Sequence, residues 1–336
     1  MDSLDMRLLR SMFPSHVFAL SGIDPRTSVQ DLSRSTHASR VTVRRRLARW
    51  REEGFWKSVV AFPNPNALGT NFQMQSFVLE RGQERTRLES ALNEVFQPVF
   101  LFQTEDVYNP VVLAESVEES ARRQRVFRDT GSGVANCPPL EVPFPSSGMR
   151  LTPRDWQIIA ALRRASGTDW AAVAKDVGVT VRGLERRVAR LMAEHALFFF
   201  PELDFRRSPG SVAWVGALFA RSADARRLES DLARRYPDLL PVEPIFPFEV
   251  LLPPAVRPAF GGSFAFLLPV PSASTGDQLR RDIGAIPGVV HVLVGFPTQN
   301  LHFPQAFDGR IELARAGRGP PDGVSRRAKA AQGTLE

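Results

Sequence analysis

Apolar residues recur at helical spacing in the first part of the chain and are followed by a run typical of a strand. The pattern predicts three helices and then one strand, at 4–13, 28–35, 39–54 and 55–62. Ser39 is a suitable N-cap for the third helix, in which Val43, Leu47 and Trp50 share one face. Three short helices followed by a strand indicate a winged helix-turn-helix, whose third helix carries the recognition residues.

The same pattern returns later in the chain. Shifting the sequence by 141 residues superimposes residues 28–55 on residues 169–196, and apolar positions then meet apolar positions. Identical residues fall together at Arg45 and Arg186, Arg46 and Arg187, Ala48 and Ala189, Arg49 and Arg190, and Glu53 and Glu194. The helices of the second copy are predicted to begin after the capping residues Thr152, Asp169 and Thr180. A repeat of this length indicates a duplicated unit.

Each helix-turn-helix segment is followed by the order strand, helix, strand, strand, helix, strand. The predicted segments are 72–79, 85–95, 99–103, 111–114, 118–128 and a strand within 134–144 in the first copy. In the second copy they are 212–220, 223–236, 239–246, 263–270, 276–285 and 289–296. This order is that of a ferredoxin-like βαββαβ domain. The predicted fold class is therefore α+β, a winged helix-turn-helix followed by a ferredoxin-like domain, with the whole unit repeated twice.

The predicted domain boundaries follow from these segments and from turn-rich stretches between them. Winged helix-turn-helix domains are expected at 1–65 and 150–206, ferredoxin-like domains at 66–145 and 207–305, and a disordered basic tail at 310–336.

The charge of the chain favours polyanionic partners. It carries 43 Lys and Arg against 36 Asp and Glu, a net charge of +7. The single cysteine, Cys137, excludes an intrachain disulfide, and the five histidines have no spacing typical of a metal site. No apolar run approaches the ~20 residues that span a bilayer. We therefore expect a cytoplasmic chain with no membrane association, no metal, no cofactor, no catalytic residue and no enzymatic activity.

The helix-turn-helix segments at 28–56 and 169–198, with the βαββαβ order after each, resemble the Lrp/AsnC (leucine-responsive regulator) family of transcription factors. The resemblance implies a sequence-specific transcription regulator that binds double-stranded DNA. It also implies that the ferredoxin-like (RAM-like) domains serve dimerisation and bind a small-molecule effector. A tandem chain then forms a pseudo-dimer within one polypeptide, with a homodimer as a further option.

The candidate DNA-binding residues lie off the apolar faces of the two recognition helices. In the first copy Ser39, Arg40, Thr42 and Arg44 are placed for base contacts, and Arg45, Arg49, Arg51 and the wing residue Lys57 for phosphate contacts. In the second copy the candidates are Thr180, Arg182, Arg186, Arg187 and Arg190. Residues 1–60 carry a net charge of +5 and residues 151–200 one of +3, and Gly183 and Glu185 lie early in the second helix. We call each winged helix-turn-helix domain a head, and we expect the first head to bind DNA more strongly than the second.

Two alternatives stay open. The architecture also resembles the siroheme decarboxylases, which implies a tetrapyrrole enzyme or binding protein whose helix-turn-helix is structural; of that group's middle-strand run, residues 103–111 keep Tyr108 and Asn109. The other alternative is a protein-interaction module whose basic helix-turn-helix domains bind acidic partners.

Eight phenylalanines lie on the predicted strands of the ferredoxin-like domains. They favour a packed core, or an apolar effector pocket between the two sheets. These residues are Phe96, Phe100, Phe102, Phe246, Phe248, Phe260, Phe264 and Phe266.

Overall fold

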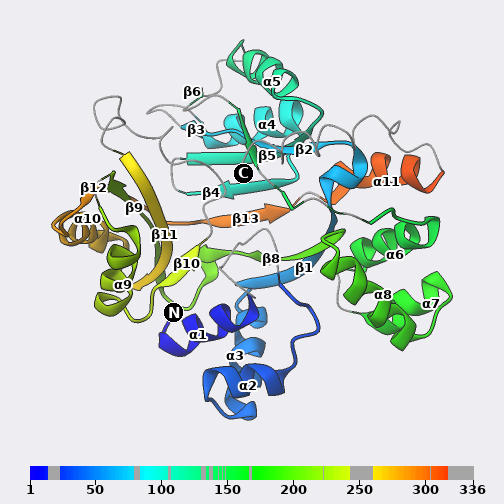
Figure 1. Cartoon of the computed structure of the whole chain (residues 1–336), viewed down its shortest axis with the longest axis horizontal. Coiled ribbons are helices and arrows are strands. Elements are labelled where there is room, and N and C mark those ends of the chain that lie inside the picture. Colours follow the sequence, from blue (N-terminus) through cyan, green and yellow to red (C-terminus); the bar gives the residue numbers. More distant parts are fainter. Residues whose placement is uncertain are drawn as a thin grey trace. The chain divides into compact units, whose positions relative to one another are not determined.

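A computed structural model of the chain is shown in Figure 1. The residues that the structure describes are 1–13, 23–78, 84–104, 107–129, 134–135, 139–142, 144–145, 147, 149–165, 169–221, 223–242, 260–302 and 304–316. In the described part of the chain no helix is both long and apolar enough to cross a membrane. Phe246, Phe248 and Cys137 lie outside the described residues.

The first winged helix-turn-helix has the elements that the sequence predicts. It consists of α1 (Ser3–Met12), α2 (Val29–Thr36), α3 (Arg40–Glu52) and β1 (Trp56–Pro63). Capping explains where the helices begin, because Asp2, Ser28 and Ser39 each accept a hydrogen bond from a backbone N–H of the first turn. Val43 and Trp50 of α3 are fully buried, as their spacing on one face requires.

The second winged helix-turn-helix repeats the same order. It consists of α6 (Pro153–Arg164), α7 (Trp170–Val177), α8 (Val181–Ala193) and β8 (Leu197–Leu203). The predicted caps Thr152, Asp169 and Thr180 all accept the expected backbone hydrogen bond. Strand β8 pairs with β1, so the wing-end strands of the two copies form a two-stranded sheet.

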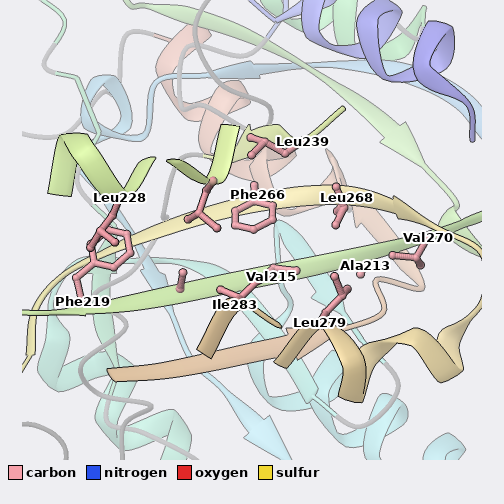
Figure 2. Close-up of a cluster of buried hydrophobic side chains, with 12 residues drawn as sticks. Ala213, Val215, Phe219, Leu228, Leu239, Phe266, Leu268, Val270, Leu279 and Ile283 are labelled. Atoms are coloured by element: carbon pink, nitrogen blue, oxygen red, sulfur yellow. The ribbon is translucent and has the colours of Figure 1, made fainter. Parts of the chain in front are cut away.

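The second ferredoxin-like domain is an antiparallel sheet with two helices. Its elements are β9 (Ser211–Ala220), α9 (Ala225–Arg235), β10 (Leu240–Val242), β11 (Phe260–Val270), the 3₁₀ turn η5 (Ala273–Thr275), α10 (Gly276–Gly284) and β12 (Val289–Gly295). The strand order β10-β11-β9-β12 is the ferredoxin-like one. Figure 2 shows its core, in which Val215 and Phe266 of the sheet lie with Leu279 and Ile283 of α10. Residues 243–246 of the predicted strand 239–246 lie outside the described residues.

The first ferredoxin-like domain has the same topology with three modifications. Its elements are β2 (Asn71–Met74), β3 (Phe77–Val78), α4 (Arg85–Phe96), β4 (Phe100–Gln103), β5 (Val107–Ala114), α5 (Val117–Asp129), β6 (Val134–Ala135) and β7 (Leu140–Val142). The order β4-β5-β2-β7 matches that of the second domain. The first strand of the βαββαβ unit is divided into β2 and β3, and the last into β6 and β7. Strand β3 pairs with β5 and β6, and β13 (Gln299–His302) is added beside β4. Phe96, predicted on a strand, ends helix α4 instead.

Short helical segments complete the described chain. They are the 3₁₀ turns η1 (Pro65–Leu68), η2 (Phe205–Arg207) and η6 (Pro304–Phe307) and the helix α11 (Asp308–Arg315). Residues 310–315, predicted to belong to a disordered tail, form most of α11 because Ile311 is buried and anchors the helix. Residues 317–336 of that predicted tail lie outside the described residues.

The chain divides into two compact units that do not follow the order of the sequence. One unit contains residues 1–57, 102–108 and 203–300, so it combines the first helix-turn-helix with the second ferredoxin-like domain. The other contains residues 58–101, 109–202 and 301–336, and combines the second helix-turn-helix with the first ferredoxin-like domain. We call them the first and the second unit. The duplication itself is confirmed, and each head is grouped with the sheet of the other copy.

Candidate functional site

The predicted DNA-contact residues occupy the outer faces of α3 and α8. Ser39 and Thr180 serve as N-caps, with their hydroxyls 3.1 Å from the backbone nitrogens of Thr42 and Gly183. Thr42 and Arg187 are partly buried, and the remaining predicted residues are exposed: Ser39, Arg40, Arg44, Arg45, Arg49, Arg51, Lys57, Thr180, Arg182, Arg186 and Arg190. The structure thus groups the predicted residues of the first copy on the first head and those of the second copy on the second head.

Some arginines of the two recognition helices form ion pairs with carboxylates of the same head. Arg187 donates to the carboxylate of Asp155, which is fully buried at the start of α6. Arg46 makes the equivalent contact with Asp5, which is 1% exposed, and also binds Asp2 at 2.6 Å. Each recognition helix is therefore fastened to the first helix of its head by an arginine and a buried carboxylate. Arg187, one of the predicted DNA-contact residues, thus forms an ion pair within its own head.

A second cluster of cations surrounds Asp204 in the first unit, and we call it the Asp204 cluster. Asp204 is 2% exposed and lies at the end of β8, where its side chain caps η2. Arg206 forms two hydrogen bonds with it at 2.9 Å, while Lys57 and Arg207 approach it at 3.7 and 4.0 Å. Among the described residues, three cations therefore approach this one carboxylate.

The ionisation of Asp204 follows from these contacts. Burial opposes its negative charge, but the hydrogen bonds and charge of Arg206 and the charge of Lys57 outweigh burial and lower the pKa of the carboxyl below its ordinary value. The carboxylate therefore stays ionised and holds the cations in place. Arg206 and Arg207 keep 53% and 65% of their side-chain surface exposed, so both remain accessible to an anion.

Close backbone approaches hold this cluster to the end of α3. The backbone N–H of Asp204 donates to the carbonyl of Phe55, and the rings of Phe55 and Phe205 meet edge to face at 5.6 Å. Gly54 has a φ of +76°, and a β-carbon there would lie 3.0 Å from Cδ of Arg207. A glycine at this position therefore permits both the left-handed turn and the close passage of Arg207.

The Asp204 cluster adjoins the end of β12 and the β4–β5 hairpin. The backbone N–H of Arg206 donates to the carbonyl of Thr298, whose own N–H and hydroxyl both donate to the carbonyl of Gln103. One residue further along the hairpin, Thr104 approaches Gly295, where a β-carbon would lie 3.3 Å from its methyl group. Residues from three distant segments of the sequence thus meet beside the cluster.

From Gly295 the sheet presents a partly apolar surface, which we call the Trp214 face. Ala213 and Val215 point into the core of Figure 2, so Trp214 and Gly216 point to the opposite side of β9. The register places Gly295 opposite Trp214, Leu293 opposite Gly216 and His291 opposite Leu218. An indole, two glycines, two leucines and an imidazole therefore share one face. Trp214 and the residues of β12 are half-buried, whereas Gly216 and Leu218 are buried.

This arrangement combines cations with a flat apolar surface and is suited to an anionic ligand that has a planar apolar body. The sequence did not single out Arg206, Arg207 or Trp214, because their neighbours come from segments about 100 to 200 residues away. The sequence signal that could have indicated this cluster is the pair of adjacent arginines, Arg206 and Arg207, shortly after the predicted wing strand of the second copy. Among the described residues no group of three His, Cys, Asp or Glu side chains is arranged to hold a metal ion.

Comparisons with known proteins bear on the fold. No family model and no curated protein matches the chain. A crystal structure of the siroheme decarboxylase NirDL in co-complex with an iron-uroporphyrin III analogue has a TM-score of 0.45 at 12% identity, and covers 94% of this chain and 99% of that chain. LrpC of B. subtilis has a TM-score of 0.28 at 14% identity over 44% of this chain. The leucine response regulatory protein LrpA of Mycobacterium tuberculosis has a TM-score of 0.29 at 18% identity over 45% of this chain.

These comparisons correct two predictions. The two structures of the siroheme decarboxylase NirDL cover 94% and 93% of this chain, whereas the two regulators cover 44% and 45% of it. The comparisons therefore contradict the predicted function of a transcription regulator and the prediction of no enzymatic activity. The predicted fold, a winged helix-turn-helix followed by a ferredoxin-like domain and repeated twice, is confirmed by the element order and the strand orders of the two sheets.

Proposed function

We propose that the chain is an enzyme that binds and acts on a tetrapyrrole with several carboxylates, of the siroheme decarboxylase kind, and that its helix-turn-helix heads are structural. The observation that carries this proposal is that contacts of Thr298, Gln103 and Thr104 connect the Asp204 cluster to the Trp214 face in the first unit. The name of the ligand class comes from the enzyme whose fold spans the chain. The support comes from this chain's own residues.

The Asp204 cluster supplies what a polycarboxylate needs. Arginine binds carboxylates with two parallel N–H donors, and Arg206 already binds Asp204 in this way. Arg207 and Lys57 lie beside it, and the exposed guanidinium groups of Arg206 and Arg207 are accessible to carboxylates of a ligand. Ligand carboxylates bound here would exchange water for charge-assisted hydrogen bonds, which are about twice as strong as neutral ones.

The Trp214 face supplies the second requirement, a surface for a flat macrocycle. The indole of Trp214 lies over Gly216, where a β-carbon would be 3.2 Å from its Cη2 atom, and Gly295 adds no side chain. Aromatic rings stack in offset fashion and bury a large apolar area. The hairpin that supplies Thr104 leads into Tyr108 and Asn109. These are the two residues on which the sequence resemblance to the siroheme decarboxylases rests.

A structural role for the heads is supported by the way each is fastened. Arg46 and Arg187 are committed to buried carboxylates. In the second unit α11 also fixes the second head, since Asp308 pairs at 2.8 Å with Arg163 of α6, whose side chain is 5% exposed. Heads that are held in place by buried ion pairs are suited to a structural role next to a ligand site, and this favours that role over DNA binding.

The proposal includes the organisation of the chain. We take the domain boundaries expected from the sequence as its working division, with the two copies forming a pseudo-dimer within one polypeptide. The small molecule expected at the ferredoxin-like domains is then a substrate. Decarboxylation breaks the bond between a side-chain carbon and its carboxylate, releases carbon dioxide and places a proton on that carbon, so it requires no oxidant.

The proposal is tested with iron-uroporphyrin III and the full chain. Binding is followed by the shift of the porphyrin absorption band, and products are examined by mass spectrometry for the loss of carbon dioxide. We expect saturable binding that the double variant Arg206→Gln and Arg207→Gln weakens. The control variant, Arg227→Gln with Arg234→Gln on α9, removes the same charge from the first unit outside the cluster. An unshifted band at saturating porphyrin, or equal weakening by both variants, would refute the proposal.

A further inference from the structure

The Asp204 cluster has a structural counterpart in the other copy. Asp204 follows β8 and caps η2, and Asn64 follows β1 and caps η1, at an offset of 140 residues. The backbone N–H of Asp204 donates to the carbonyl of Phe55 at 2.9 Å, and that of Asn64 donates to the carbonyl of Ala196 at 3.0 Å. The two acceptors, Phe55 and Ala196, are themselves related by the repeat. Asp204 and Asn64 thus occupy equivalent places.

The chemistry at the two places differs. Asn64 is fully buried, and its side-chain nitrogen donates at 2.7 Å to the carbonyls of both Pro145 and His195, so its amide joins three segments of the second unit. The repeat places neutral residues where the Asp204 cluster has its cations: Asn66 for Arg206, Ala67 for Arg207 and Phe198 for Lys57. Phe198 is 2% exposed and packs against Phe144.

We infer that the duplicated chain binds one polyanionic ligand and not two, at the Asp204 cluster, and that the Asn64 position is a neutral anchor that binds none. The inference rests on the proposed function. It assigns different roles to the two equivalent turns. The turn at Asp204 carries cations that bind the ligand, and the turn at Asn64 joins segments of the second unit by hydrogen bonds.

The physical reason is the cost of placing a carboxylate at a neutral, buried turn. An anion loses hydration there and gains no opposite charge in return, which is strongly unfavourable. Asn64 already spends both of its amide protons on backbone carbonyls, and its amide oxygen accepts the N–H of Asn66. The side chain of Asn64 therefore offers no donor that an anion could take without breaking the anchor.

The experiment is a count of bound iron-uroporphyrin III per chain, by native mass spectrometry and by optical titration. We expect one porphyrin per chain, with affinity reduced about tenfold or more in the variant Arg206→Gln with Arg207→Gln. The control Arg227→Gln with Arg234→Gln should bind one porphyrin with unchanged affinity.

The other outcomes separate the inference from the proposed function. Two porphyrins of similar affinity would overturn the inference and leave the proposed function standing. One porphyrin that is unaffected by loss of Arg206 and Arg207 would overturn the assignment to the Asp204 cluster. No bound porphyrin would refute the proposed function, and the inference with it.

Discussion

Arg187 of α8 binds the carboxylate of Asp155 at 2.8 Å, and Asp155 in turn accepts the backbone N–H and hydroxyl of Thr152 at the start of α6. The carboxylate is fully buried, so it depends on this arginine for compensation of its charge. Removing one partner of such a pair leaves a buried charge alone and typically costs about 3–5 kcal/mol. The partial exposure of Arg187 places the expected cost at or below the lower end of that range.

The first prediction is that Arg187→Gln lowers the free energy of unfolding by about 2–3 kcal/mol. Urea denaturation followed by circular dichroism measures it. The matched control is Arg186→Gln, because Arg186 is the exposed neighbour on the same helix turn and should change stability by less than about 0.5 kcal/mol. Equal effects of the two variants would show that the contact with Asp155 does not stabilise the head.

The second prediction concerns acid. Burial raises the pKa of Asp155, but the hydrogen bonds of Arg187 and Thr152 outweigh it, so the pKa falls below the ordinary value of 3.8. The stability that this carboxylate contributes is therefore present above pH 3.8 and lost as the pH falls through the lowered value. In Asp155→Asn the unfolding midpoint should be lower at neutral pH and should fall less on acidification than in the wild type.

Asp5 is the counterpart of Asp155 and should behave in the opposite sense. Burial and the charge of Asp2 raise its pKa, and together they outweigh the backbone hydrogen bond from Asp2 and the charge of Arg46, which lower it. A raised pKa means that its contribution is fully present below 3.8 and is lost as the pH rises through the folded-state value. Asp5→Asn should therefore remove a gain of stability on acidification. The same pH dependence in both variants would contradict this assignment.

The third prediction concerns the anchoring of α11 in the second unit. Phe307 is fully buried, meets the ring of Phe62 at 5.5 Å and lies 5.4 Å from the guanidinium of Arg163. Phe307→Ala should cost about 3–5 kcal/mol of stability and expose α11 to proteases. Leu313→Ala on the same helix is the control, since Leu313 is 53% exposed and should have little effect. Similar protease sensitivity of the two variants would contradict the anchoring role.

The fourth prediction concerns the Trp214 face. Trp214→Leu should weaken binding of iron-uroporphyrin III by about tenfold, and Trp214→Phe should retain most of the affinity because it keeps an aromatic surface. Gly216→Val should act like Trp214→Leu, since its side chain would occupy the space of the indole. Optical titration measures all three. Unchanged affinity in both Trp214→Leu and Gly216→Val would place the macrocycle elsewhere.

The fifth prediction concerns the first head. Arg40 and Arg44 are exposed on α3 and contribute nothing to the Asp204 cluster. Replacing both with Ala should leave porphyrin affinity within about twofold of the wild type. Tenfold weaker binding would show that the outer face of α3 belongs to the ligand site.

The sequence by itself determined the local structure and the duplication. Apolar spacing and capping residues identified every helix of both heads, because these signals act within a few residues of the chain. The order of strands and helices identified both ferredoxin-like domains, since βαββαβ restricts the sheet to few topologies. Exposed arginines on α3 and α8 were located correctly, yet local pattern could not tell that Arg187 faces a buried carboxylate.

Only the tertiary structure decided what is brought together. The compact units combine each head with the sheet of the other copy, an exchange that a repeated sequence cannot specify, because either pairing satisfies the same apolar faces. The Asp204 cluster depends on this exchange, since Lys57 comes from the first copy while Asp204, Arg206 and Arg207 come from the second. Its chemistry arises from long-range contacts between segments about 150 residues apart, and local periodicity carries no information at that separation.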